Sequence, residues 1–371
     1  MATTIQSAAL CGLHVDSVFV EVDIHFGIKA FHIVGLPDRA VREASGRIES
    51  AFKQCKLDYP RYRILVNLAP AHLQKQGTHY DVPMALGLLV EQGILKQDAC
   101  RNVLVIGELG LDGTIRPVHG ALLLTQFAKA SGMGQVIVPA MNAQEAACIE
   151  GIDVVGVDHL SRLIAHMSGL EMIEPTAPTR FAPPERTHTC DLSHVRGHAH
   201  AKRALEIAAA GGHNILMSGP PGSGKTLLAR TLSTILPALS QQEALEVTSI
   251  HSVAGRLKQG YVSQRPFRAP HHTASGIALI GGGSKLQPGE ISLAHRGVLF
   301  LDEIAEFPSH VLEELRQPLE EGTVTISRVA GTVEYPARFT LVGAMNPCPC
   351  GYANDRSNPC ICSPINIARY R

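Results

Sequence analysis

The segment that most limits how this chain can fold is Gly-Pro-Pro-Gly-Ser-Gly-Lys-Thr at positions 219–226. It matches G-x-x-x-x-G-K-[S/T] at every position, and it separates a short apolar run at 214–218 from a helical pattern at 225–236. Backbone N–H groups of such a loop, with the amino terminus of the next helix, bind phosphate oxygens. The segment therefore predicts a buried strand, a loop and a helix that together bind a nucleoside triphosphate. The alternative, a glycine-rich turn that holds a lysine by chance, does not explain a full match in this context.

Each position of the segment has an expected role with ATP and Mg²⁺. Lys225 places its charge on the β- and γ-phosphates and is a candidate catalytic residue, while Thr226 offers its hydroxyl to Mg²⁺. The residues expected to bind the nucleotide are Gly219, Pro220, Pro221, Gly222, Ser223, Gly224, Lys225, Thr226 and Leu227.

Two further strands are expected to end beside this loop. An apolar run at 298–301 predicts a buried strand followed by Asp302 and Glu303, and ligands of α/β sheets bind at the carboxyl ends of strands. Asp302 is expected to bind Mg²⁺, and Glu303 to orient and deprotonate the attacking water; a solvated acidic turn is the alternative. Asn346, after the apolar run 340–345, is a candidate for contact with the γ-phosphate or the water, unless it only begins a turn before a proline.

Proline content divides the chain into two regions. Residues 169–191 hold four prolines among charged and small residues without an apolar period, which is typical of an extended linker. Residues 1–168 mix strand and helix patterns, which indicates an α+β domain. Residues 192–371 alternate strands with helices, which indicates a mostly parallel α/β sheet.

Charge and hydropathy limit the location and the partners. The 33 basic and 33 acidic residues give a formal net charge of zero, so a nucleic-acid site would have to be a local patch. The first 24 residues lack Lys and Arg, unlike a secretory signal, and no apolar run approaches the roughly 18 residues of a membrane helix. A cytoplasmic location without a membrane partner is expected.

Four of the nine cysteines form two C-x-C pairs within residues 348–362. Four thiolates can bind one Zn²⁺ tetrahedrally and close a loop of this kind. The commoner zinc spacing is C-x₂-C, so free thiols and a redox-sensitive pair are alternatives. The candidate zinc ligands are Cys348, Cys350, Cys360 and Cys362.

A basic segment lies between the expected halves of the nucleotide site. Residues 251–297 hold six basic side chains and one acidic side chain, Glu290, and a β-hairpin pattern follows at 321–336. Such loops can contact nucleic-acid phosphates without base specificity; a role at a subunit interface or towards the nucleotide is the alternative. The adjacent His271 and His272 are expected to contact phosphate or an interface. The candidate DNA contacts are Arg256, Lys258, Arg265, Arg268, Lys285 and Arg328.

Long stretches outside these motifs carry a family resemblance. Among them are residues 15–27, 33–38, 107–113, 270–275 and 288–302. Through them the chain resembles the magnesium-chelatase-like AAA+ ATPases of the YifB/ComM family. The resemblance implies a hexameric ring ATPase that acts as a branch-migration helicase on single-stranded or branched DNA during natural transformation and recombination. A chelatase-type ATPase that remodels a partner protein is the alternative.

The amino-terminal domain is similar to the Lon-type protease domain at residues 77–89 and 107–130. In that family a serine and a lysine form the catalytic pair; the matching positions here are His79 and Leu122. The pair needs a hydroxyl and an amine that removes its proton, so no peptidase activity is expected. An ATP-dependent protease is therefore the weakest alternative.

The family resemblance also implies elements beyond Arg371. These are an arginine finger and a helical lid that carries a second sensor arginine. The expectation is an AAA+ core that is incomplete at its carboxyl end, binds nucleotide more weakly than a longer chain and hydrolyses it poorly.

Overall fold

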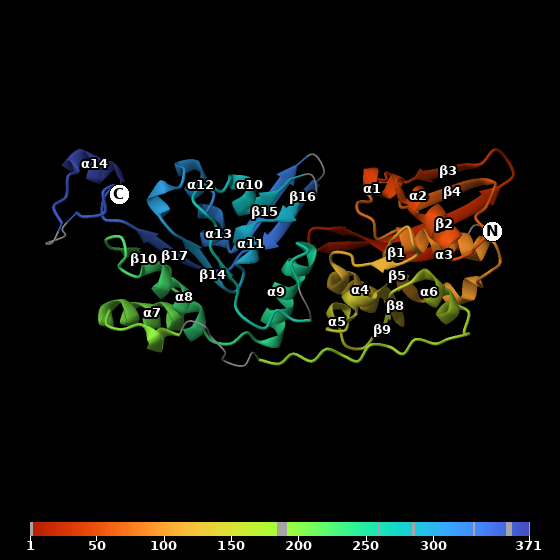
Figure 1. Ribbon diagram of the computed structural model, residues 1–371, viewed down its shortest axis with the longest axis horizontal. Coiled ribbons are helices and arrows are strands. Elements are labelled where there is room, and N and C mark those ends of the chain that lie inside the picture. Colours follow the sequence, from red (N-terminus) through yellow and green to blue (C-terminus); the bar gives the residue numbers. More distant parts are fainter. Residues whose placement is uncertain are drawn as a thin grey trace. The chain divides into compact units, whose positions relative to one another are not determined.

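The computed structural model describes residues 3–183, 191–257, 260–283, 286–328, 331–353 and 358–370, apart from the side chain of Arg328. The chain forms two compact units (Figure 1). The first unit contains Met1–Phe181 and His251–Tyr261. The second contains Ala182–Ile250 and Val262–Arg371.

The first unit is built on a seven-stranded mixed sheet in the order β3-β4-β2-β1-β5-β8-β9. Strands β1 and β2 pair antiparallel, with Thr3 opposite Val22, and β2 also pairs antiparallel with β4. The other neighbours are parallel. The strands are β1 (Thr3–Cys11), β2 (His14–His25), β3 (Ala30–Val34), β4 (Arg63–Ala69), β5 (Val103–Val105), β8 (Gln135–Pro139) and β9 (Asp153–Val157).

Helices cover both faces of this sheet, because β1 alternates its buried side chains between two hydrophobic clusters. Ile5 joins the cluster with α2, α3 and α6, and Ala8 joins the cluster with α4 and α5. Gly87 lets α3 approach the sheet, since a Cβ there would lie 2.4 Å from Val22 Cγ2. The helices are α1 (Arg39–Arg42), α2 (Ala44–Gln54), α3 (Asp81–Glu91), α4 (Ala121–Ala130), α5 (Ala143–Ala146) and α6 (Leu160–Met167). Shorter elements are η1 (Gln97–Cys100), η2 (Ala140–Asn142), β6 (Glu108–Leu109) and β7 (Ile115–Arg116).

The boundary between the units falls after Phe181, within the expected linker 169–191, but part of that linker packs on the first unit. Residues 169–181 belong to the first unit, where Thr176 N donates to Val154 O at 2.7 Å and Thr179 N donates to Ala147 O at 2.9 Å. Backbone hydrogen bonds hold this extended segment although it has no apolar period, so composition could not reveal its packing. The start of the expected insertion, His251–Tyr261, also groups with the first unit, where Tyr261 OH donates to Cys148 O at 3.0 Å.

The second unit contains the expected parallel α/β sheet. Its order is β10-β17-β14-β11, and all three pairings are parallel. The strands are β10 (Ile215–Ser218), β17 (Thr340–Met345), β14 (Val298–Leu301) and β11 (Phe267–Arg268). Helices α7 (Ala199–Gly211) and α8 (Lys225–Ile235) pack against this sheet (Figure 1). Val298, Phe300, Val342 and Ala344 form the core with Leu228 and Leu232.

The prediction that residues 214–218 form a buried strand is wrong. Strand β10 lies at the edge of the sheet, and its Leu216 side chain is 60% exposed. The apolar run looked like that of a central strand, but among the described residues it has a strand neighbour on one side only. Strand β14, by contrast, is buried along its whole length, as expected.

The remaining elements of the second unit surround the sheet. The hairpin expected at 321–336 is confirmed as β15 (Thr323–Arg328) and β16 (Gly331–Pro336), with Thr323 opposite Pro336. The other elements are η3 (Leu192–His194), α9 (Gln241–Val253), α10 (Gly276–Ile280), β12 (Gly281–Gly282), β13 (Gln287–Pro288), α11 (Glu290–Leu293), η4 (Ile304–Glu306), α12 (Ser309–Glu313), α13 (Arg316–Glu321) and α14 (Pro364–Tyr370). Among the described residues, every helix is too short or too polar to reach across a lipid bilayer.

Candidate nucleotide-binding site

The glycine-rich segment 219–226 connects the end of β10 to the start of α8. Gly222 and Gly224 adopt φ angles of 78° and 80°, in the left-handed region that favours glycine. A Cβ at either position would meet nothing within 4 Å, so backbone conformation and not crowding calls for glycine. Gly224 is the N-cap of α8, so the helix begins directly after the loop. The segment thus has the strand–loop–helix structure that its motif predicts.

The side chain of Lys225 folds back onto the start of this loop. Its Nζ donates hydrogen bonds to Gly219 O at 2.8 Å, to Pro220 O at 3.0 Å and to Asn346 Oδ1 at 3.3 Å. Partial burial lowers the pKa of the Lys225 amine, and the nearby carboxylates of Asp302 and Glu303 oppose this shift. The structure therefore brings together the lysine and the amide that we expected from separate motifs.

The two candidate magnesium ligands are hydrogen-bonded to each other. Thr226 Oγ1 donates to Asp302 Oδ2 at 2.8 Å, and the other carboxylate oxygen of Asp302 accepts a bond from Glu303 N at 3.0 Å. Asp302 directly follows β14, the strand separated from β10 by β17. A hydroxyl and a carboxylate oxygen are ligands suited to Mg²⁺, which binds through a few protein oxygens and keeps several waters.

Glu303 adopts a φ of 52°, an uncommon conformation for a residue with a side chain. Its Oε2 lies 3.2 Å from His272 Nδ1. The His272 ring lies against that of His271, with 4.1 Å between centroids, and near the Phe307 ring at 6.4 Å. Sequence reasoning expected a phosphate or interface contact for the adjacent histidines and missed this contact with the candidate base.

A second residue missed by sequence reasoning is Tyr370. It ends α14, and its hydroxyl is partly buried beside Glu306 and the backbone of Asn346. Burial and the negative charge of Glu306 raise the pKa of this phenol. No motif surrounds Tyr370, so only the fold could place it near the strand end that carries Asn346.

Two bacterial proteins are similar to this chain over nearly its whole length. Competence protein ComM of Haemophilus influenzae is 42% identical over 375 residues, which cover 99% of this chain and 72% of that protein. YifB of Escherichia coli K12 is 43% identical over 367 residues, with the same shares of both chains. The chain belongs to the YifB/ComM family.

Two family models match different parts of this YifB/ComM family member. The model described as "Magnesium chelatase, subunit ChlI" matches residues 191–371, and "Subunit ChlI of Mg-chelatase" matches residues 20–142. The magnesium-chelatase 38 kDa subunit of Cereibacter sphaeroides is 27% identical over 174 residues, 42% of this chain and 52% of that protein. The family is therefore one of chelatase-like AAA+ ATPases that use ATP and Mg²⁺. A Lon-type amino-terminal domain stays a prediction.

The structure brings the four clustered cysteines of this family member together. Their sulfur atoms all lie within 4.8 Å of one another. The distances from Cys348 Sγ to those of Cys350 and Cys360 are 3.3 and 3.7 Å, and Cys350 and Cys360 are 3.6 Å apart. Tetrahedral zinc with bonds of about 2.3 Å requires sulfur separations of about 3.8 Å. The observed spacing is close to that value.

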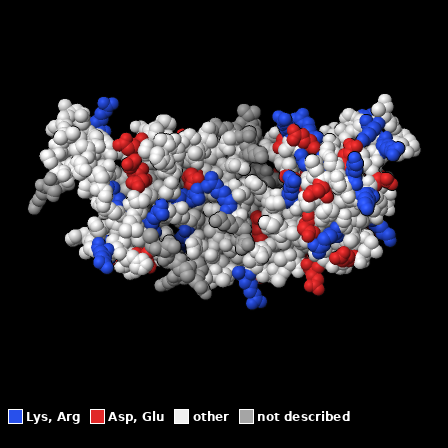
Figure 2. Space-filling view, in the orientation of Figure 1, with Lys and Arg blue, Asp and Glu red and all other residues white. Residues whose placement is uncertain are grey.

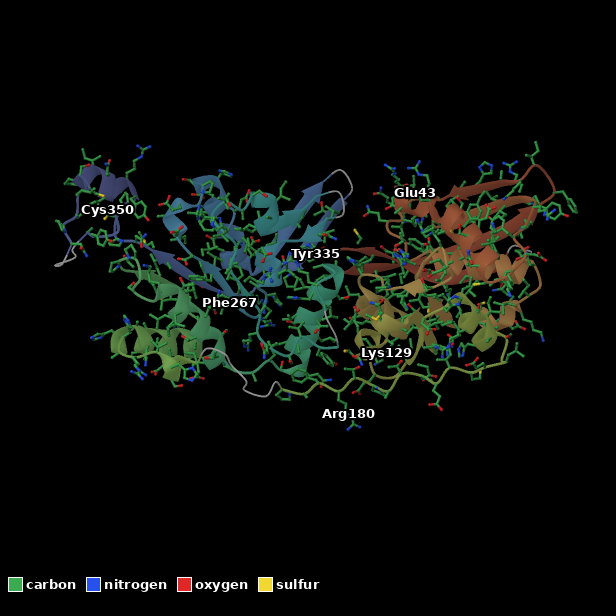
Figure 3. The ribbon with its side chains drawn as sticks, viewed as in Figure 1. Glu43, Lys129, Arg180, Phe267, Tyr335 and Cys350 are labelled. Carbon is green, nitrogen blue, oxygen red and sulfur yellow. The ribbon has the colours of Figure 1, made fainter. Side chains whose placement is uncertain are left out.

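Backbone N–H groups also point at these sulfur atoms. Ala353 N donates to Cys348 Sγ at 3.2 Å. Hydrogen bonds from the backbone of Tyr352 and Ile361 lower the pKa of the Cys350 thiol to about 6, which favours the thiolate that a metal binds. Figure 3 labels Cys350, in the loop between β17 and α14.

Two candidate DNA contacts, Arg268 and Arg265, form ion pairs within the second unit. Arg268 donates to both carboxylate oxygens of Glu290, at 2.5 and 2.7 Å. Arg265 pairs with Glu243 of α9 at 3.4 Å, and its side chain is only 16% exposed. The sequence shows Glu290 as the only local acid, but α9 supplies another in space. Basic and acidic side chains also lie side by side on the face shown in Figure 2.

The structure says less about the other four candidate DNA contacts. Lys258, Lys285 and the side chain of Arg328 lie outside the described residues. Arg256 is exposed and belongs to the part of the chain that groups with the first unit. DNA contact by any of the six candidate residues stays a prediction.

Proposed function

We propose that this chain hydrolyses ATP with Mg²⁺ at the 219–226 loop and that hydrolysis drives a ring-shaped motor on DNA. The observation that supports ATP hydrolysis is that polar side chains after the ends of β10, β14 and β17 lie close together. Thr226 and Asp302 are hydrogen-bonded at 2.8 Å, while Lys225 reaches Asn346 at 3.3 Å. A glycine-rich turn or an acidic turn with no function would not require these four polar side chains to converge.

Each residue has a role in the proposed reaction. Backbone N–H groups of the loop and the Lys225 ammonium bind the β- and γ-phosphates, and Mg²⁺ held by Thr226 and Asp302 would neutralise the developing charge. Glu303 accepts the proton of the attacking water as the bond between that water and the γ-phosphorus forms. The bond to the β-phosphate oxygen breaks, which releases ADP and phosphate. Asn346 orients the γ-phosphate or the water.

The DNA part of the proposal rests on the relatives. One of them is named a competence protein, and competence is the ability of a bacterium to take up DNA. A hexameric ring would form a central channel through which the motor moves along single-stranded or branched DNA. Basic residues such as Arg256 would contact the DNA phosphates. A cytoplasmic location fits this role.

DNA-stimulated ATP hydrolysis is the test. Turnover of the full-length protein is measured at low salt without DNA, with single-stranded DNA and with a four-way junction, because phosphate contacts weaken as salt rises. The proposal predicts faster turnover with either DNA. If neither DNA binds nor stimulates at low salt, the motor on DNA is wrong, although ATP hydrolysis could still stand.

A chelatase-like ATPase that remodels a partner protein is the second candidate. The match to a magnesium-chelatase subunit favours it. It predicts ATP turnover that is insensitive to DNA and that rises with a protein partner.

A protease has less support, because burial lowers the pKa of His79 to about 4 and its Nε2 lies 2.9 Å from Ala8 O, as in a structural histidine.

Zinc at the four clustered cysteines is part of the same proposal. The sulfur separations and the backbone N–H groups around them support a structural Zn²⁺. Free thiols and a redox-sensitive pair are the alternatives that elemental analysis of the purified protein tests.

A further inference from the structure

We propose that Zn²⁺ bound by the four cysteines holds the phosphate-binding loop in place, so that zinc and nucleotide bind cooperatively. The four cysteines lie in residues 348–353 and 358–362, here called the cysteine loop. The inference rests on the proposed ATP site and adds a second site that regulates it.

The cysteine loop touches the phosphate-binding loop directly. A Cβ at Gly351 would lie 2.6 Å from Pro221 Cδ and 2.8 Å from its Cγ, so the Gly351 backbone packs closely on that ring. Gly351 also has a φ of 86°, which favours glycine. Pro221 lies within the segment expected to wrap the phosphates. A displacement of Gly351 would therefore remove one wall that supports this segment.

The cysteine loop is also joined to the site through β17. Cys348 comes two residues after Asn346, whose Oδ1 accepts a hydrogen bond from Lys225 Nζ at 3.3 Å. Cys348 is buried, so the metal would fix the chain immediately beyond Asn346. The position of the amide, and through it that of the lysine, then depends on how this end of β17 is held.

The other end of the cysteine loop leads into α14. That helix begins at Pro364, two residues after Cys362, and ends at Tyr370. Tyr370 lies beside Glu306 and the backbone of Asn346. One bound ion would thus connect the end of β17 and the start of α14 to the phosphate-binding loop, which lies far earlier in the sequence.

Cooperativity follows from this connection. Without a metal the four thiols leave the loop without a cross-link, whereas a bound metal closes it. If zinc raises nucleotide affinity, nucleotide must raise zinc affinity by the same factor. Coupling of this kind commonly changes affinity by about fivefold or more.

The first experiment compares Cys360→Ser with Cys11→Ser, an exposed cysteine outside the cluster. Zinc per chain is measured by elemental analysis, affinity with a fluorescent ATP analogue and Mg²⁺, and folding by circular dichroism. The wild-type protein and Cys11→Ser should hold one zinc per chain and bind the analogue equally. Cys360→Ser should lose zinc and bind at least about fivefold more weakly.

A second variant tests the contact without removing a ligand. Gly351→Ala keeps all four cysteines but places a methyl group against Pro221. Gly197→Ala is its control, because Gly197 has a φ of 70° and nothing within 4 Å of an added Cβ. Gly351→Ala should retain zinc and bind the analogue more weakly, and Gly197→Ala should change neither property.

The reciprocal measurement applies to the wild-type protein and needs no variant. Zinc release to a chromogenic chelator is followed with and without a non-hydrolysable ATP analogue and Mg²⁺, and nucleotide should slow it. An absence of zinc in wild-type protein grown with added zinc overturns the metal site. Equal affinities of zinc-loaded and zinc-free folded protein, with equal release rates, overturn the coupling.

Lys225→Ala separates this inference from the proposed function. That variant should lose nucleotide binding and keep one zinc per chain. If Lys225→Ala binds nucleotide as the wild-type protein does, the proposed ATP site fails, whatever the zinc content.

Discussion

The carboxylate of Glu303 and the imidazole of His272 are in contact, with 3.2 Å between Oε2 and Nδ1. The two residues come from separate segments of the second unit, and the His272 ring packs against His271 and Phe307. Glu303 is the candidate base for water attack, and we expect the packed imidazole of His272 to orient its carboxylate. His272 is therefore a candidate positioning residue that no motif indicated.

Replacement of His272 should slow turnover more than it weakens binding. In His272→Ala, Glu303 loses the contact that orients it, and misplacement of a reacting group can cost up to about a hundredfold in rate. We expect a fall in kcat with nucleotide affinity unchanged, and partial recovery in His272→Gln, which restores a hydrogen-bond donor. A loss of affinity with normal kcat would show that His272 contacts the nucleotide instead.

Glu303→Gln should bind ATP and fail to hydrolyse it. The amide has nearly the same shape but cannot accept the proton, and general-base catalysis commonly contributes about 10²–10⁴-fold. Steady-state phosphate release and equilibrium binding of an ATP analogue measure the two properties. Hydrolysis at the wild-type rate would remove Glu303 from its assigned role.

Lys225→Ala should abolish measurable nucleotide binding, because it removes the only charge aimed at the β- and γ-phosphates from this loop. The matched control is Lys53→Ala, which removes an exposed lysine on α2 of the first unit. Binding is measured with a fluorescent ATP analogue and Mg²⁺ at several salt concentrations. The nucleotide site is assigned wrongly if both variants bind as the wild-type protein does.

Acid should destabilise the first unit through His79. Burial lowers its folded-state pKa to about 4, whereas the ordinary value is 6.5. The unfolded chain therefore binds more protons between these values, and stability present above pH 6.5 is lost as the pH falls towards 4. From pH 7 to pH 5 the loss from this group is about 2 kcal/mol.

Hydrogen exchange of amides in β1 and α3 measures this loss. Protection in the wild-type protein should fall between pH 7 and pH 5, after correction for the intrinsic exchange rate. His79→Gln removes the titrating group and should reduce the pH dependence, although it is less stable at pH 7. An unchanged pH dependence in that variant would assign the effect to other groups.

Local sequence was sufficient for the features that depend on contiguous residues. The segment 219–226 predicts its loop because the glycine conformations and the helix start at Lys225 are set within a few residues. The apolar run 298–301 predicts the buried strand β14 for the same reason, and the alternation in 321–336 predicts the hairpin. Family membership likewise followed from stretches of sequence and was confirmed by the relatives.

Contacts between distant segments could not be derived in this way. The sequence around Arg265 contains no acid that predicts Glu243 as its partner, and nothing near Leu216 shows that its strand lies at a sheet edge. The same holds for His272 beside Glu303 and for Gly351 against Pro221. Local backbone preferences act within a few residues, so a motif is enough to predict them. Burial, ion pairing and the convergence of side chains depend on long-range packing, which exists only once the chain has folded.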